Sequence, residues 1–258
     1  MIIQVNAGQI IWHDLLTPDV TEAMRFYTEL LGWEYQIEHS SDFVWHPGEA
    51  DYPLIWANGE AHGGLVDSGQ GSISGWIAYV RVDDVDAVTL NAKELGATVV
   101  RDPFDIPGVG RSAVIRDLQG AVICPTVPSY SFPPPSGTFA RDDLNTEDMV
   151  IAQAFYRSLL GWQVSDTGEQ TSLYGVKSDH SGKSDVIRIV KRSLTKTRAA
   201  IWLPYLATGD IEATISHAKA LGANVVLERF GEAGADQLAI MRDLQGAAFG
   251  LLMSRKSD

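Results

Sequence analysis

The sequence predicts an α+β protein built from two copies of one domain, because three motifs occur twice in the same order. Residues 26–33, FYTELLGW, return as FYRSLLGW at 155–162. LGATVV at 95–100 returns as LGANVV at 221–226, and RDLQG at 116–120 returns unchanged at 242–246. The offsets between the copies are 129, 126 and 126 residues. Three blocks in one order at nearly one offset indicate a tandem duplication.

The first quarter of the chain predicts a strand, a helix and a further set of strands. The segment 10–16 is short and rich in apolar side chains, which favours a strand. A helix start follows this strand. Thr17 is suited to the capping position, Pro18 to the first helical position, and Asp19 supplies the acidic side chain favoured near a helix N-terminus. Apolar residues then recur at spacings of three and four up to Leu31, and Gly32 ends the helix. The strand candidates that follow are residues 33–37, 43–45, 54–56 and 63–66.

The second quarter repeats this order, and the second half repeats both quarters. Residues 76–82 predict a strand, Asp83 and Asp84 cap a helix that ends at Gly96, and three strands follow at 98–101, 112–116 and 121–124. The second half predicts helices at about 148–160 and 209–221. Four βαβββ modules, two in each domain, account for nearly the whole chain.

A proline-rich segment separates the two halves. Residues 125–139 contain five prolines, which do not fit a central strand and favour an extended spacer. We predict an N-terminal domain over residues 1–127, a linker over 128–137 and a C-terminal domain over 138–258.

Composition restricts the partners and the compartment. The net charge of −13 argues against non-specific binding to nucleic acid, which needs basic patches. Cys124 is the only cysteine, which excludes an intrachain disulfide and fits a reducing compartment. The N-terminus lacks the features of a signal peptide, and no stretch approaches the ~20 apolar residues of a membrane span. We expect a cytoplasmic monomer or homodimer that binds neither nucleic acid nor membrane.

The order of the motifs resembles the vicinal-oxygen-chelate superfamily, which includes glyoxalase I, bleomycin-resistance proteins and extradiol dioxygenases. The matching patterns are TPD…A…FY…LLGW in the first module and VDDVDA…LGA…RD…QGA in the second. The resemblance covers residues 8–127 and 138–253, and PGVGR at 107–111 is similar to tandem glyoxalase-like proteins. It implies that the two modules of each domain form a curved mixed sheet, a cup.

The resemblance also implies where a metal would bind. Enzymes of the superfamily usually hold a divalent metal in the cup through His, Gln or Glu, and the metal acts as a Lewis acid. The corresponding positions are Trp12, Ile77 (or Trp76) and Cys124 in the first half, and Arg141, Ile201 (or Trp202) and Gly250 in the second.

These residues are not the usual ligands, so we predict no bound metal or other cofactor. A divalent metal remains the alternative, with His13 as the candidate ligand, because a slip of one residue in the strand would turn His13 into the cup. The counterpart of His13 in the repeat is Asp142. The other histidines show no metal-ligand spacing.

The candidate ligand site lies in the N-terminal cup. Trp12 and Asp14 lie on the same side of their strand, and we expect a cleft lined by both and by Trp76, with Cys124 deeper in the wall. Two indoles would stack on a planar ligand and a carboxylate would hold a cation or a hydroxyl, which favours an aromatic cation. The C-terminal cup, built around Arg141 and Asp143, is differently charged and should not bind the same compound equally.

The sequence therefore favours a small-molecule-binding protein, similar to bleomycin-resistance proteins, that lacks the usual metal ligands. One alternative is a metal-dependent lyase, isomerase or dioxygenase of the same superfamily. If the protein is an enzyme, we expect a glyoxalase-like lyase or a dioxygenase. Another alternative is a non-catalytic scaffold or stress protein. The sequence does not name the ligand, establish catalysis, or show whether one cup or both are used.

Overall fold

A computed structural model describes residues 7–41, 48–69, 74–129, 137–166, 172–175, 186–191, 199–229 and 237–253. The strand candidate at 43–45 lies outside these residues. The first half contains β1 (Ile10–Thr17), α1 (Val20–Leu31), β2 (Glu34–Ser41), β3 (Glu49–Ala57), β4 (Glu60–Asp67), β5 (Gly75–Arg81), α2 (Val85–Glu94), β6 (Thr98–Ile106), β7 (Gly110–Arg116) and β8 (Val122–Pro128). The second half contains β9 (Phe139–Thr146), α3 (Met149–Leu160), β10 (Gln163–Asp166), β11 (Ser172–Gly175), β12 (Val186–Lys191), β13 (Ile201–Ala207), α4 (Ile211–Ala220), β14 (Asn224–Arg229), β15 (Gln237–Arg242) and β16 (Ala248–Met253).

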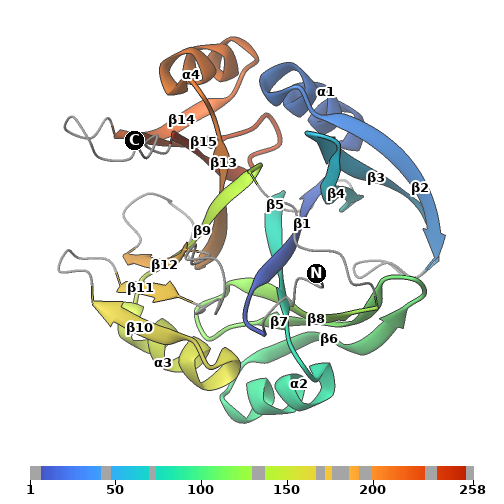
Figure 1. Ribbon diagram of the computed structural model, residues 1–258, viewed down its shortest axis with the longest axis vertical. Helices are drawn as coiled ribbons and strands as arrows, with labels where there is room; N and C mark the ends of the chain where they lie inside the picture. Colours follow the sequence, from blue (N-terminus) through green and yellow to red (C-terminus); the bar gives the residue numbers. More distant parts are fainter. Residues whose placement is uncertain are drawn as a thin grey trace, which may run out of the picture.

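The predicted α+β duplication is confirmed. Each half forms one eight-stranded mixed sheet, in the order β2-β3-β4-β1-β5-β8-β7-β6 and β10-β11-β12-β9-β13-β16-β15-β14 (Figure 1). The second order is the first with every strand number raised by eight. In each sheet the two βαβββ modules join where their first strands pair antiparallel, β1 with β5 and β9 with β13.

Aspartates begin all four described helices. The side chains of Asp19, Asp84, Asp148 and Asp210 accept hydrogen bonds from backbone N–H groups in the first turn of their helix. The first cap is therefore Asp19 and not Thr17, and Pro18 precedes the helix. Gly32 adopts a left-handed conformation with φ of 71° at the end of α1, as the sequence predicted.

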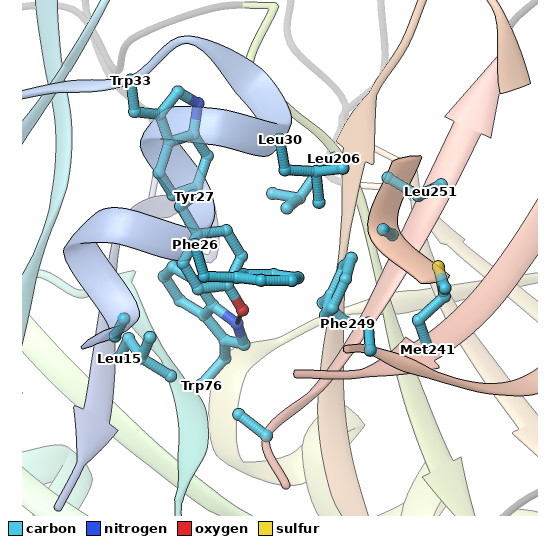
Figure 2. Packing of buried hydrophobic residues seen from close by; sticks show 14 of the residues in the cluster. Leu15, Phe26, Tyr27, Leu30, Trp33, Trp76, Leu206, Met241, Phe249 and Leu251 are labelled. Atoms are coloured by element: carbon cyan, nitrogen blue, oxygen red, sulfur yellow. Dashed lines mark hydrogen bonds between the residues drawn. The ribbon is translucent and has the colours of Figure 1, made fainter. Parts of the chain in front are cut away.

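The main hydrophobic cores lie between the two halves. One joins Phe26 and Tyr27 of α1 to Phe249 of β16 and to Ile211 and Ile215 of α4, and Figure 2 shows the aromatic part of it. The other joins α2, β5, β7 and β8 to α3 and β12 in the same way. The helix-bearing face of each sheet is thus covered largely by the other half, and the opposite face, here called the cup face, carries none of the described helices.

The sequence predicts the boundary between the halves in the proline-rich segment. Strand β8 ends at Pro128 and β9 begins at Phe139, while residues 130–136 lie outside the described residues. The linker and the domain boundaries therefore stay predictions. No described helix is both long and apolar enough to cross a membrane.

Candidate functional site

The repeated motifs build the contact between the halves. The Tyr27 hydroxyl of the first FY motif donates to Asp243 Oδ2 of the second RD motif at 3.1 Å. Reciprocally, the Tyr156 hydroxyl donates to Asp117 Oδ2 at 3.0 Å. All four residues are buried. The strongest signals in the sequence therefore specify assembly of the two halves and not a ligand site.

Trp76 belongs to this contact and not to the cup face. In the register between β1 and β5, Trp76 lies opposite Leu15, whereas Ile77 lies opposite Asp14. Trp76 is 4% exposed, and its indole Nε1 donates to the Tyr27 hydroxyl at 3.3 Å. The structure therefore does not bring Trp76 to Trp12 and Asp14, because adjacent strand residues point to opposite faces.

The cup face of the N-terminal sheet is organised around Asp14, which is 3% exposed. The Tyr52 hydroxyl donates to Asp14 Oδ1 at 2.5 Å, and the Tyr79 hydroxyl donates to Oδ2 at 2.5 Å. Trp12 Nε1 donates to Asp14 Oδ1 at 3.2 Å and to the Tyr52 hydroxyl at 2.8 Å. The structure thus brings Trp12 to Asp14 and adds two tyrosines that the sequence reasoning missed.

A glycine makes room for this arrangement. Gly64 of β4 lies directly opposite Asp14, and a Cβ atom there would lie 2.0 Å from the Tyr52 ring. Its lack of a side chain lets Tyr52 lie across β4 and reach Asp14. Strand alternation from Ile77 would have found Tyr79. Tyr52 comes from β3 and could not be found without the pairing of β3 with β4.

Burial sets the protonation of the cluster. Burial raises the pKa of Asp14, although hydrogen bonds from Tyr52, Tyr79 and Trp12 favour the carboxylate. Burial also raises the pKa of the Cys124 thiol well above its ordinary value, and the nearby Asp14 charge adds to this. Cys124 lies opposite Tyr79 in the pairing of β5 with β8 and is fully buried. A thiol held neutral in this way is a poor nucleophile.

Partly buried apolar side chains surround the cluster. Ile77, Phe104 and Val122 pack with Trp12 against the buried residues of this face. The Arg101 guanidinium lies over the Phe104 ring, 3.6 Å from its centroid. The face therefore combines a buried carboxyl group, hydroxyl and indole donors, and aromatic surface.

The cup face of the C-terminal sheet retains the Asp–Tyr pair with different neighbours. Asp143 and Tyr205 occupy the positions of Asp14 and Tyr79 in the repeat, and Tyr205 hydrogen-bonds to Asp143. Arg141 is the counterpart of Trp12, and its Nε atom lies 3.0 Å from Asp143 Oδ1. A Cβ atom at Gly250 would lie 2.2 Å from the Tyr205 ring, so this glycine makes room for the tyrosine.

His13 faces the other half of the protein. Its Nε2 lies 2.9 Å from Asp142 Oδ1, and its ring stacks on Phe139 at 4.0 Å. Asp142 is the repeat counterpart of His13, so the pair forms where the two copies of the first strand meet. Strand alternation turns His13 away from Trp12, and the register slip that would make it a cup ligand does not occur. His62 lies buried in β4 beside Thr138.

The residues present do not fit the metal site of the superfamily. No group of three His, Cys, Asp or Glu side chains converges among the described residues in a way that could hold a metal. Asp14 accepts protein hydrogen bonds on both oxygens, and Asp143 is paired with Arg141. The inherited positions hold indole, aliphatic, thiol and guanidinium side chains and one glycine, of which only the Cys124 thiol is an ordinary metal ligand.

Two relatives match over nearly the whole chain. The putative glyoxylase CFP32 of Mycobacterium tuberculosis is 29% identical over 249 residues, covering 93% of each protein. The anthracycline biosynthesis protein DnrV of Streptomyces peucetius is 27% identical over 270 residues, covering 96% of this chain and 94% of DnrV. The match therefore extends over nearly the full length of both proteins in each comparison.

Solved structures share the fold at low identity. The 2,3-dioxygenase LapB from Pseudomonas sp. KL28 superposes with a TM-score of 0.62 at 12% identity, covering 97% of this chain and 94% of LapB. The Mn(II)-bound glyoxalase from Novosphingobium aromaticivorans gives a TM-score of 0.59 at 14% identity, covering 96% and 82%. At these identities the likeness shows the fold alone.

The family is shown by the sequence itself. The glyoxalase-like domain model matches residues 11–126 and again residues 142–252. The first match covers nearly all of β1–β8, and the second covers most of β9–β16. With both halves matched and both sheets in the same strand order, the chain belongs to the glyoxalase-like domain family, of which it carries two copies.

Proposed function

We propose that this protein binds a planar small molecule on the cup face of its N-terminal sheet without using a metal. The observation that carries the proposal is the Asp14 cluster. A buried carboxyl group is held by Tyr52, Tyr79 and Trp12, and the rings of Tyr52 and Trp12 are only partly buried. Such a cluster offers aromatic surface for stacking beside hydroxyl groups that can exchange hydrogen bonds with a ligand.

The cluster favours a neutral ligand over the aromatic cation that the sequence suggests. Three donors already satisfy the Asp14 carboxyl group, and its burial disfavours the charged form. A ligand hydroxyl group would donate to the Tyr52 hydroxyl oxygen, because the Tyr52 O–H itself donates to Asp14. The relative DnrV is named for anthracycline biosynthesis, and anthracyclines are planar polycyclic compounds that carry hydroxyl groups. That name supports a hydroxylated polycyclic aromatic ligand.

The test is a calorimetric titration of alizarin, a dihydroxyanthraquinone, into wild type and variants. Trp12→Ala should weaken binding several-fold, because an aromatic pair is worth about 1 kcal/mol. Trp12→Phe keeps a ring and should bind more tightly than Trp12→Ala. Leu90→Ala, at an exposed position on α2, is the control and should bind as wild type does. If Trp12→Ala and Asp14→Asn bind alizarin as wild type does, the site lies elsewhere.

The metal-dependent alternative has its own test, because the relative CFP32 is named as a putative glyoxylase. Elemental analysis of protein purified without a chelator or an affinity tag should find less than one equivalent of zinc, nickel, iron or manganese. We expect this low metal content because the described side chains on the two cup faces do not form a metal site. One tightly bound equivalent that disappears in His13→Ala would contradict this prediction and favour the enzyme.

A further inference from the structure

We propose that Trp56 is a specificity-determining residue of the N-terminal cup face, and that its indole N–H donates to a carbonyl oxygen of the bound ligand. The ligand class then narrows from hydroxylated planar aromatics to hydroxyaryl ketones and quinones. This inference rests on the function proposed above. It deepens that function, because none of the contacts described for the Asp14 cluster calls for a carbonyl group.

Strand alternation places Trp56 on the same face as Tyr52. Strand β3 pairs with β2 over its whole length without a register shift, so side chains alternate regularly along β3. Ile55 and Ala57, the neighbours of Trp56 in the chain, pack against the core between the halves. Trp56 therefore points to the cup face, where Tyr52 of the same strand reaches Asp14.

The indole N–H of Trp56 lacks an acceptor. Its Nε1 atom is hidden from solvent and has no hydrogen-bond partner among the described residues. Glu34, directly across on β2, is exposed and does not accept from it. A hidden donor without an acceptor costs free energy, which an oxygen atom of a ligand would recover. Because an indole N–H only donates, the ligand must supply an acceptor, and a carbonyl oxygen is the simplest one on a planar ring system.

Trp56 lies within reach of a ligand that stacks at Trp12. Trp56 is opposite Ala61 of β4. Two residues further along β4, Gly63 is opposite His13 of β1. Trp56 and Trp12 are therefore at nearly the same level of the sheet, two strand spacings or about 10 Å apart. Both rings are partly exposed. A change of side-chain rotamer, which commonly accompanies binding, would turn the N–H of Trp56 toward a fused-ring ligand on this face.

The second copy of the domain shows that the fold does not require an indole at this position. Leu54 of β3 and Leu173 of β11 are equivalent, because each lies opposite the residue that pairs with the cup-face aspartate. Two residues later the first copy has Trp56 and the second has Gly175. The unsatisfied indole is therefore a feature of the N-terminal face, where the aromatic cluster lies.

The test uses two planar tricyclic probes, a hydroxyfluorenone and the hydroxyfluorene with its hydroxyl group at the same ring position. They differ only in a carbonyl group against a methylene group. Each is titrated calorimetrically into the full-length protein. Wild type should bind the ketone about threefold to tenfold more tightly than the hydroxyfluorene, which is the effect of one neutral hydrogen bond. Trp56→Phe keeps an aromatic ring without the N–H and should bind the two probes equally.

Tyr35→Phe is the matched control. It removes a buried hydroxyl group that also has no hydrogen-bond partner in the described ranges. Tyr35 lies opposite Ile55 on β2 and packs against the core between the halves, so it belongs to the other face of the same strand pair. Tyr35→Phe should therefore keep the wild-type preference for the ketone.

A spectroscopic readout separates a hydrogen bond from packing. The indole N–H signal of Trp56 in a proton–nitrogen correlation spectrum is the one that disappears in Trp56→Phe. Hydroxyfluorenone should move this signal downfield further than hydroxyfluorene does. Equal movement with both probes would overturn the hydrogen bond. If Trp56→Phe fails to fold, the preference of wild type decides, because equal binding of the two probes would overturn the proposal.

The outcomes also separate this inference from the proposed function. If Trp12→Ala weakens binding of both probes while Trp56→Phe keeps the preference for the ketone, the N-terminal site stands and the role of Trp56 is overturned. If wild type binds neither probe at millimolar concentrations, or Trp12→Ala binds both as wild type does, the proposed function fails and the role of Trp56 fails with it.

Discussion

Asp14 and Asp143 stand at the same position in the two copies of the domain, yet their neighbours give them different chemistry. Asp14 accepts hydrogen bonds from the neutral groups of Trp12, Tyr52 and Tyr79. Asp143 is paired with the charged Arg141. The same carboxyl group therefore serves a neutral, aromatic cluster in one half and a cationic cluster in the other.

At the residue scale, the glycines under the two tyrosines should tolerate no side chain. Gly64→Ala and Gly250→Ala would place a methyl group against the rings of Tyr52 and Tyr205. Each should lower the free energy of unfolding by about 1–3 kcal/mol, the usual cost of overpacking. Gly75→Ala is the matched control, because nothing lies within 4 Å of its Cβ position. Equal denaturation midpoints for all three variants would contradict the assigned role of the two glycines.

Also at this scale, Asp243 should make stability depend on pH. Burial raises the pKa of Asp243 from 3.8 to about 6. Its deprotonation is therefore less favourable in the folded state, so the stability contributed by this group is present below pH 3.8 and is lost as the pH rises through about 6. Relative to wild type, Asp243→Asn should gain on the order of 2 kcal/mol between these limits. Parallel stability curves from urea denaturation across this window would contradict the prediction.

At the element scale, helices α1 and α3 connect the halves by the same contact used twice. Each carries an FY motif whose tyrosine reaches the RD turn of the other half. A stacked tryptophan accompanies each tyrosine, Trp33 with Tyr27 and Trp162 with Tyr156. The duplicated motif therefore makes the same contact twice in the interface between the halves.

Removing either tyrosine hydroxyl should destabilise the protein by a similar amount. Tyr27→Phe and Tyr156→Phe would each leave one buried aspartate oxygen without its tyrosine donor, at a cost of about 1–3 kcal/mol. Tyr35→Phe is the control, because the buried Tyr35 hydroxyl has no hydrogen-bond partner in the described part of the chain. Urea denaturation measures all three. A loss of stability in Tyr35→Phe equal to the other two would show that the hydrogen bonds are not the cause.

At the scale of the whole molecule, the two halves share their main hydrophobic cores. Phe249 and Ile215 of the second half complete the core around α1, and the second core likewise joins α2 to α3. A domain of this size can bury its own core in principle. Here the apolar helix-bearing faces are covered across the boundary, so separation would expose both.

Separated halves should therefore fail to fold on their own. Residues 1–129 expressed alone should show little near-ultraviolet circular dichroism and should bind a hydrophobic dye, because Phe26, Tyr27 and Trp76 lose their partners from the second half. Addition of residues 130–258 should restore the native spectrum. A first half that unfolds cooperatively with native-like aromatic dichroism would contradict the shared core.

The sequence by itself determined the duplication, the order of elements in each module and the approximate positions of the helices. These depend on local signals: repeated motifs, apolar spacing, capping aspartates and helix-ending glycines. Alternation along one strand also placed Trp12 and Asp14 on a common face, because this relation is internal to the strand.

Only the tertiary structure decided which residues meet from different strands. Trp76 was expected on the same face as Trp12 and Asp14, but the register of β5 against β1 places Ile77 opposite Asp14, and a one-residue difference reverses the face. Tyr52 joins Asp14 across Gly64, and His13 meets Asp142 across the two halves. Strand pairing and domain docking bring together residues 38 and 129 positions apart, and no local pattern in the sequence encodes such distances.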